Sequence, residues 1–195
     1  MKFVDTDSET LQWFPTFMQW KSADEREEWA ELCALAVLHA HDENPKRRRI
    51  KGLRKLLSAF VENLSDLTPA DQAFLFIPDP DQMPVPAFIL MVESEGERGA
   101  TLRQMVQADA ASLVRPVELD PFTSERLGEG LRSTRYWSTA DDQLMVTVRY
   151  GWRVEDVGVD LCFYMVWNDP GQMATYADAV DDFARSLFIS DGRQV

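Results

Sequence analysis

The sequence has 195 residues, 45% of them hydrophobic, and its 33 acidic and 20 basic side chains give a formal net charge of −13. This composition is typical of a globular protein with a sizeable core, and the negative charge argues against a general affinity for nucleic acid. No stretch approaches the roughly 18 consecutive apolar residues of a membrane span, and the N-terminus turns acidic without an apolar leader, so we expect a cytoplasmic protein with no membrane span.

The N-terminal third is predicted to be helical after an aromatic start. Residues 1–21 are acidic and then aromatic around Pro15, and we expect an arm or short helix packed onto the body, or alternatively a partner-binding segment. Ser22 with Glu25 three residues later forms a capping box and predicts a helix to about Ala40. Its expected buried residues are Trp29, Leu32, Cys33, Ala36, Val37 and Ala40.

A second helix is predicted from about Lys46 to Asn63, antiparallel to the first because the connection is short. Seven of the ten residues from Lys46 to Lys55 are basic. This run could be a docking face for an acidic protein, a phosphate group or an anionic lipid, or it could be a solvated face that balances the acidic surface. In the docking interpretation Ile50, Leu53 and Leu57 hold the helix to the body. The contact residues are then Arg47, Arg48, Lys51 and Lys55.

Short apolar runs at Ala73–Ile77 and Ala87–Val92 predict two buried strands separated by a loop with four prolines. A helix is expected from Thr101 to Leu113. Two weaker strands, from Arg115 to Leu127 and from Gly130 to Ser138, follow it, and Asp141-Asp142 is expected to form a tight turn.

The strongest pattern comes near the C-terminus. Residues 144–152 and 157–167 alternate with a period of two, which predicts two strands that each bury one apolar face. Joining them through residues 153–156 places Trp152 opposite Val157 and Arg149 opposite Asp160. An amphipathic helix from Met173 to Leu187 is expected to cover the apolar face.

These elements predict an α+β fold with a mostly antiparallel sheet of five or six strands. The C-terminal helix is expected on one face and the N-terminal helices on the other. We expect residues 1–68 to form a helical extension and residues 69–195 the sheet domain, packed as one compact unit.

The order strand, helix, strand meander and closing helix, ending in Asp182-Phe183-Ala184-Arg185-Ser186-Leu187-Phe188-Ile189, resembles the PsbP-like superfamily over about residues 72–190. That superfamily includes a photosystem II extrinsic subunit, a Ran-binding nuclear protein and bacterial surface lipoproteins. The resemblance implies a non-enzymatic binding or accessory role, and no functional residue carries over from it. The signal sequence and lipobox cysteine of the lipoprotein members are absent.

No catalytic, cofactor or metal site is predicted. His39 and His41 are two residues apart and would point to different faces of a helix, unlike the paired histidines of a zinc protease. The chain has no Gly-x-Ser-x-Gly elbow, and acidic turn residues such as Asp79 and Asp81 are common for conformational reasons. Cys33 and Cys162 lie in apolar segments and are expected to be buried free thiols.

We therefore expect a non-catalytic accessory or protein-binding module that meets an acidic protein partner through Lys46–Lys55. The alternative is a small-molecule binder or enzyme that uses a cleft between the helix pair and the sheet. Neither the partner, the ligand nor the oligomeric state follows from the sequence.

Overall fold

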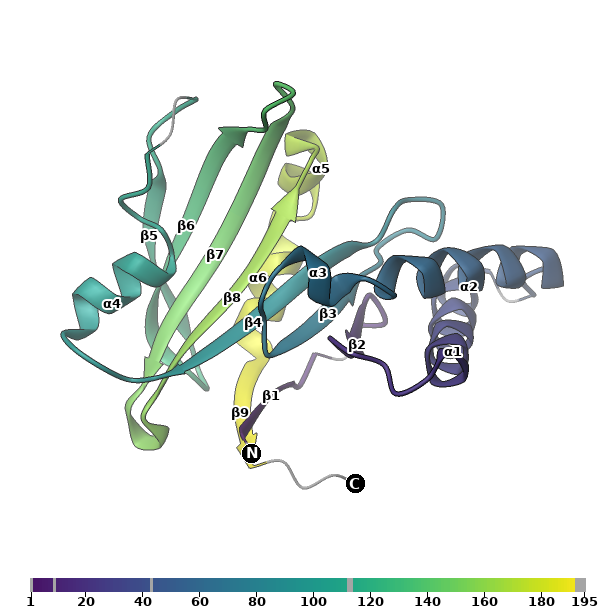
Figure 1. Cartoon of the computed structure of the whole chain (residues 1–195), viewed down its shortest axis with the longest axis horizontal. Helices are drawn as coiled ribbons and strands as arrows, with labels where there is room; N and C mark the ends of the chain where they lie inside the picture. The colour runs from purple at the N-terminus through teal and green to yellow at the C-terminus, as the bar shows by residue number, and fades with distance from the viewer. Residues whose placement is uncertain (1, 9, 43, 112–113, 192–195) are drawn as a thin grey trace. The chain divides into compact units, whose positions relative to one another are not determined.

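The structure is a computed structural model that describes residues 2–8, 10–42, 44–111 and 114–191 (Figure 1). The chain forms two compact units, one of Met1–Ser8 with Phe88–Val195 and one of Glu9–Ala87, and we call them the meander unit and the helix-pair unit. In chain order the elements are β1 (Lys2–Thr6), β2 (Trp13–Thr16), α1 (Ala23–His41), α2 (Arg47–Val61), α3 (Leu64–Leu67), β3 (Gln72–Phe76), β4 (Val85–Glu93), α4 (Arg98–Met105), β5 (Glu118–Ser124), β6 (Gly128–Ser138), β7 (Leu144–Val154), β8 (Val159–Trp167), α5 (Pro170–Thr175), α6 (Ala177–Ser186) and β9 (Leu187–Asp191).

The α+β class and the largely antiparallel sheet are confirmed, but the sheet is larger than expected. Its seven strands have the order β2-β3-β4-β8-β7-β6-β5, and β1 and β9 form a second, two-stranded sheet. The extra strands come from segments that were expected to be an arm and the end of a helix. In the described part of residues 1–21, β1 and β2 replace the expected arm or short helix. Pro15 lies within β2, which is an edge strand, where a missing N–H is tolerated.

In the helix-pair unit, the predicted start of α1 is confirmed. The Ser22 hydroxyl accepts a hydrogen bond from the Glu25 N–H at 3.1 Å, and the Glu25 carboxylate accepts one from the Lys21 N–H at 2.9 Å. The buried stripe differs, because Leu32 is 63% exposed and Ala40 is also exposed. Apolar residues occur on nearly every side of α1, so their spacing does not select one face. The buried residues of α1 are Ala30, Cys33, Ala34, Val37 and Leu38.

In the meander unit, helices cover both faces of the antiparallel strands β5 to β8 (Figure 1). Tyr150 contacts Asp181 of α6, whereas a Cβ on the next residue, Gly151, would lie 3.0 Å from Val106 at the end of α4. Neighbouring residues of a strand point to opposite faces, so α4 and α6 lie on opposite sides of β7. We expected N-terminal helices on the face opposite α6, and over β7 this place is taken by α4.

Helix α4 also differs from its predicted range. It begins at Arg98 rather than Thr101, because the Glu97 side chain caps it by accepting hydrogen bonds from the N–H groups of Gly99 and Ala100. It ends at Met105, and the expected end at Leu113 lies outside the described residues.

The hairpin of β7 and β8 has a different register from the one expected. Trp152 lies opposite Leu161, four residues beyond Val157, and Arg149 lies opposite Tyr164 rather than Asp160. The turn occupies residues 155–158 instead of 153–156, because Gly158 adopts φ +63°, which favours glycine. A shift by an even number of residues keeps every side chain on its expected face. The prediction of faces was therefore right and the prediction of partners wrong.

Candidate functional sites

Two basic side chains of α2 form ion pairs within the helix-pair unit. Arg49 Nη2 lies 2.7 Å from Asp81 Oδ2. Arg54 lies 3.5 Å from Glu27 and 3.4 Å from Glu31, both on α1. These pairs are partly exposed, so each contributes little to stability. They nevertheless show which basic side chains of α2 are paired with acidic residues of the same unit.

The four predicted contact residues have a different environment from Arg49 and Arg54. Arg47, Arg48, Lys51 and Lys55 are exposed and form no ion pair with any residue in the described part of the chain. We call these four side chains the basic surface. Leu53 and Leu57 are buried and Ile50 is half-buried, as expected for residues that hold the helix to its unit. Arg47 and Lys51 also line a hollow of about 380 Å³ with Glu31, Leu35, Ile50 and Arg54.

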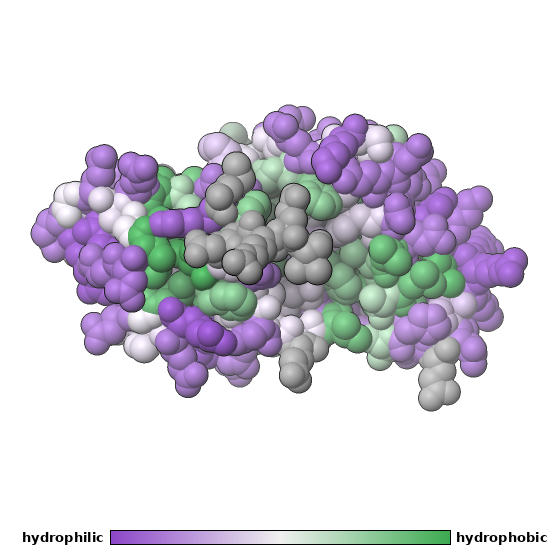
Figure 2. All heavy atoms as spheres, turned by 90° about the horizontal axis from the view of Figure 1, so that it is seen from below, coloured by the Kyte–Doolittle hydropathy of each residue, from purple (hydrophilic) through white to green (hydrophobic). Residues whose placement is uncertain are grey.

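The aromatic N-terminal segment, the alternative partner-binding region, is largely packed. Trp13 is buried against Phe76, with ring centroids 4.4 Å apart, and Trp20 donates a hydrogen bond from its indole to the Val61 carbonyl at 3.2 Å. Phe17 is 53% exposed. Figure 2 shows a mostly hydrophilic surface on the face in view, where hydrophobic atoms gather in limited patches.

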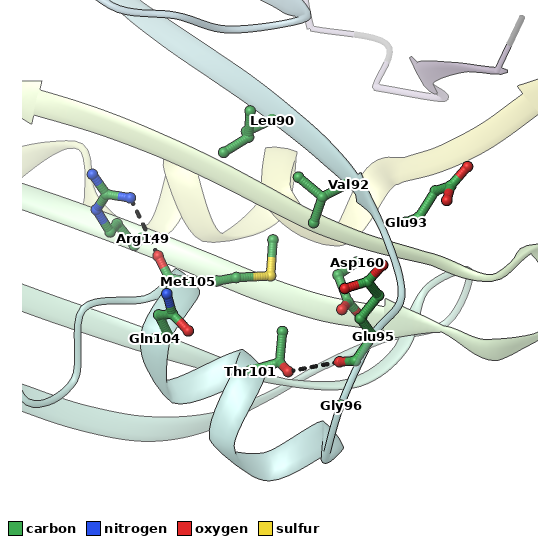
Figure 3. Close-up of a pocket in the computed structure, with 10 residues that line it drawn as sticks. All are labelled: Leu90, Val92, Glu93, Glu95, Gly96, Thr101, Gln104, Met105, Arg149 and Asp160. Carbon is green, nitrogen blue, oxygen red and sulfur yellow. Dashed lines mark hydrogen bonds between the residues drawn. The ribbon is translucent and has the colours of Figure 1, made fainter.

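A hollow of about 710 Å³ lies in the meander unit, between α4 and the sheet (Figure 3). Its walls come from the end of β4, from α4, and from single residues of β7 and β8. Arg149 lies at one end beside Gln104, and Glu95 and Asp160 lie at the other, with Met105 and Val92 between them. The hollow is lined by Leu90, Val92, Glu93, Glu95, Gly96, Thr101, Gln104, Met105, Arg149 and Asp160.

The end of the hollow near Asp160 is organised by a buried ion pair. Arg153 Nε lies 2.7 Å from Asp160 Oδ1, and its Nη2 lies 2.8 Å from Oδ2, so the contact is bidentate. The Asp160 side chain is fully buried and also accepts a hydrogen bond from Ser94. The Arg153 hydrogen bonds lower the pKa of Asp160, against the opposing effect of burial. Arg153 further donates to the carbonyls of Glu95 and Gly96, which fixes the chain where it enters α4.

The other end is built around an arginine that has no acidic partner among the described residues. Arg149 Nη1 donates to the Met105 carbonyl at 3.2 Å, and the guanidinium lies over the Tyr164 ring, 4.5 Å from its centroid. Its Nε is buried and lacks a hydrogen-bond partner. Nη1 also donates to Cys162 Sγ, 3.9 Å away, so the Tyr164 ring, one carbonyl and one thiol hold the guanidinium in place. Most of its five N–H donors have no carboxylate partner among the described residues.

The residue types most often used in catalysis are poorly placed for it. Burial raises the pKa of Cys33 to about 12 and that of Cys162 to about 11, so both thiols are protonated near neutral pH. Both are free and buried, as predicted. His39 and His41 are exposed at the end of α1, and His41 Nδ1 lies 2.9 Å from the Val37 carbonyl. Among the described residues, no three His, Cys, Asp or Glu side chains come together as a metal site.

The hollow was missed from sequence, although a signal was present. Arg149, Arg153 and Asp160 are charged residues in strands that are largely apolar on both faces, and charged residues at such positions often mark a site. The sequence matches no family model and no curated protein. Within the described ranges, no helix is both long and apolar enough to cross a membrane.

Proposed function

We propose that this protein is a non-catalytic binding module, and that the basic surface on α2 is its contact with an acidic protein partner. The supporting observation is that the basic side chains of α2 fall into two groups. Arg49 and Arg54 have carboxylate partners in the described structure, whereas Arg47, Arg48, Lys51 and Lys55 do not. A helix face that only balanced the acidic surface would place its cations against that surface.

The electrostatics of the whole chain favour the same role. The net charge is −13, so a compact positive surface gives the molecule a strong charge asymmetry. Such asymmetry orients the molecule towards acidic surfaces and speeds encounter with them. An accessory role is also what the resemblance to the PsbP-like superfamily over about residues 72–190 implies.

The test is affinity capture from the native source with the wild type and with an Arg47→Glu, Arg48→Glu, Lys51→Glu variant. The matched control is Arg103→Glu, Arg115→Glu, Arg126→Glu, which changes the net charge equally but leaves the basic surface intact. All three control residues are partly exposed and form weak ion pairs outside α2. We expect an acidic protein that the wild type and the control retain and the α2 variant loses.

The captured protein is then purified and its affinity measured across a salt series. Affinity for the wild type should fall as salt rises, since exposed charges are screened. Capture that is equal for all three proteins, or affinity without salt dependence, would refute the basic surface as the contact. The alternative function, a small-molecule binder, was expected to use a cleft between the helix pair and the sheet. The feature that favours it is instead the hollow beside α4, whose lining residues all belong to the meander unit.

A further inference from the structure

We propose that the hollow beside α4 binds a small, elongated dipolar ligand, such as a short peptide with free termini or an extended amino acid. Its carboxylate lies at Arg149, its protonated amine lies at the carboxylate of Glu95, and its apolar body lies along Val92 and Met105. This site is independent of the basic surface on α2, because every lining residue belongs to the meander unit.

The Arg149 end has the properties of a carboxylate anchor. The sequence contains 33 acidic residues, yet no described carboxylate pairs with this guanidinium. Its buried Nε lacks a hydrogen-bond partner, as does Trp152 Nε1 on the opposite face, and a bound ion is one of the explanations for such a donor. An arginine held over an aromatic ring, as Arg149 is over Tyr164, is also positioned for the planar, two-point recognition of a carboxylate.

The opposite end offers negative charge that the protein does not neutralise. Asp160 is committed to Arg153 and Ser94, so it is not available to a ligand. Glu95 is exposed and forms no ion pair with the described residues, whereas the Glu93 carboxylate points away from the hollow (Figure 3). A ligand with only negative charge would be repelled there, whereas a protonated amine would be attracted.

The spacing of the two ends sets the length of the ligand. Arg149 and Arg153 are four residues apart on β7, which corresponds to roughly 13 Å along an extended strand. Arg153 holds the Glu95 carbonyl at 2.7 Å, so the acidic end lies beside Arg153. Between the ends, Leu90, Val92 and Met105 present apolar surface. The hollow therefore suits opposite charges separated by a flexible apolar chain rather than a compact zwitterion.

The experiment titrates the isotope-labelled full chain with three probes and follows the Met105 methyl group by NMR. Aminooctanoate carries both charges, octanoate lacks the amine, and octylamine lacks the carboxylate. We expect saturable shifts with aminooctanoate at millimolar concentrations and affinities at least about tenfold weaker for the other two. No saturable shift with aminooctanoate, or equal binding of octanoate, would overturn the proposal.

Variants test the carboxylate-binding end and the amine-binding end of the hollow separately. Arg149→Met should abolish binding of aminooctanoate, whereas Arg103→Met, an exposed residue of the same unit that pairs with Asp109 outside the hollow, should leave it unchanged. Glu95→Gln should weaken aminooctanoate and leave octanoate unaffected. Glu95 is exposed, so this variant is expected to fold, and its retention of full aminooctanoate affinity would refute the dipolar assignment even if Arg149→Met unfolded.

Discussion

The two faces of the β7–β8 hairpin are built from the same two strands, yet they serve different purposes. The face below α6 is aromatic and closed: Tyr150, Trp152, Phe163 and Phe183 are each at most 1% exposed. The face below α4 carries Arg149, Arg153, Asp160 and Cys162, and leaves a hollow of about 710 Å³. A strand covered on both faces can therefore place a core on one side and a polar site on the other.

The charged groups of the two faces also differ in how completely they are paired. Below α6, the Asp181 carboxylate accepts hydrogen bonds from Tyr150 and from Arg132, whose Nε lies 3.1 Å away. Burial, together with the neighbouring Asp181 charge, raises the pKa of Tyr150 above its usual range. Below α4, Arg153 is equally well paired, but Arg149 is not. Arg149, the charged side chain of these two faces that has no carboxylate partner among the described residues, lies beside the hollow, where function is expected to compete with stability.

The largest effect is expected on the closed face. Phe183→Ala should reduce the free energy of unfolding by about 3–5 kcal/mol, because it opens a cavity beside Phe163, whose ring centroid lies 5.7 Å away. Phe17→Ala is the control, since that ring is 53% exposed, and it should cost much less. Urea denaturation of both variants measures the difference, and similar losses would mean that the α6 face is not the core.

On the opposite face, the largest effect is expected from the buried ion pair. Arg153→Met should destabilise the protein by about 3 kcal/mol, because it leaves the Asp160 carboxylate buried without its counter-ion. Replacing both residues, with Arg153→Met and Asp160→Leu, should recover much of the loss. Urea denaturation of the single and double variants checks this, and a double variant less stable than Arg153→Met would contradict it.

Because of this ion pair, the free energy of unfolding should also decrease as the pH is lowered into the acid range. The pKa of Asp160 is lowered in the folded state, chiefly by Arg153, so its carboxylate stabilises the fold above the ordinary pKa of an aspartate, about 3.9. That contribution is lost as the pH falls through the folded pKa. The difference in unfolding free energy between wild type and Asp160→Asn should therefore be constant near neutral pH and shrink in acid. A difference that grows in acid would contradict the assignment.

A smaller effect is expected at the turn that sets the register of both faces. Gly158→Ala should cost about 1 kcal/mol, because φ at this residue is +63° and no atom lies close enough to add a clash. Gly52→Ala is the matched control: it also has open space, but it lies within α2, where alanine is favoured by about 1 kcal/mol. Thermal unfolding should shift in opposite directions for the two variants, and a stabilising Gly158→Ala would place the turn elsewhere.

How much of the fold could be predicted from the sequence depends on how far apart in the chain the interacting residues lie. Local signals were sufficient for the Ser22 cap, the strand alternation of residues 144–167 and the tight turn at Asp142, whose φ is +57°. The register failed because alternation constrains only the face, and slips of an even number of residues satisfy it equally well. The strands β1 and β9 were missed because they pair across almost the whole chain, with Thr6 opposite Leu187. No local pattern records such a contact.

The two candidate sites also differ in how far they could be predicted from the sequence. The cluster of cations at Lys46–Lys55 is contiguous in sequence, so its exposure on one helix could be anticipated. The hollow joins residues from β4, α4, β7 and β8, and it exists because α4 lies against Gly151 and leaves space beside Arg149. That packing depends on the shape of the whole unit, and the sequence pattern therefore showed only that Arg149 and Asp160 share a face.

The smallest change in stability is expected for Arg149→Met. Comparing it with Arg153→Met distinguishes the roles of the two arginines on this face. Arg149→Met removes a guanidinium that has no carboxylate partner among the described residues, and the methionine can still cover Tyr164. The lost stacking and the lost hydrogen bond to Met105 oppose the relief of a partly buried, unpaired charge. The net change should stay within about 1 kcal/mol, whereas Arg153→Met should cost about 3 kcal/mol. Urea denaturation of the two variants side by side makes the comparison, and equal losses would show that Arg149 is a structural residue like Arg153 rather than a binding residue held ready for a ligand.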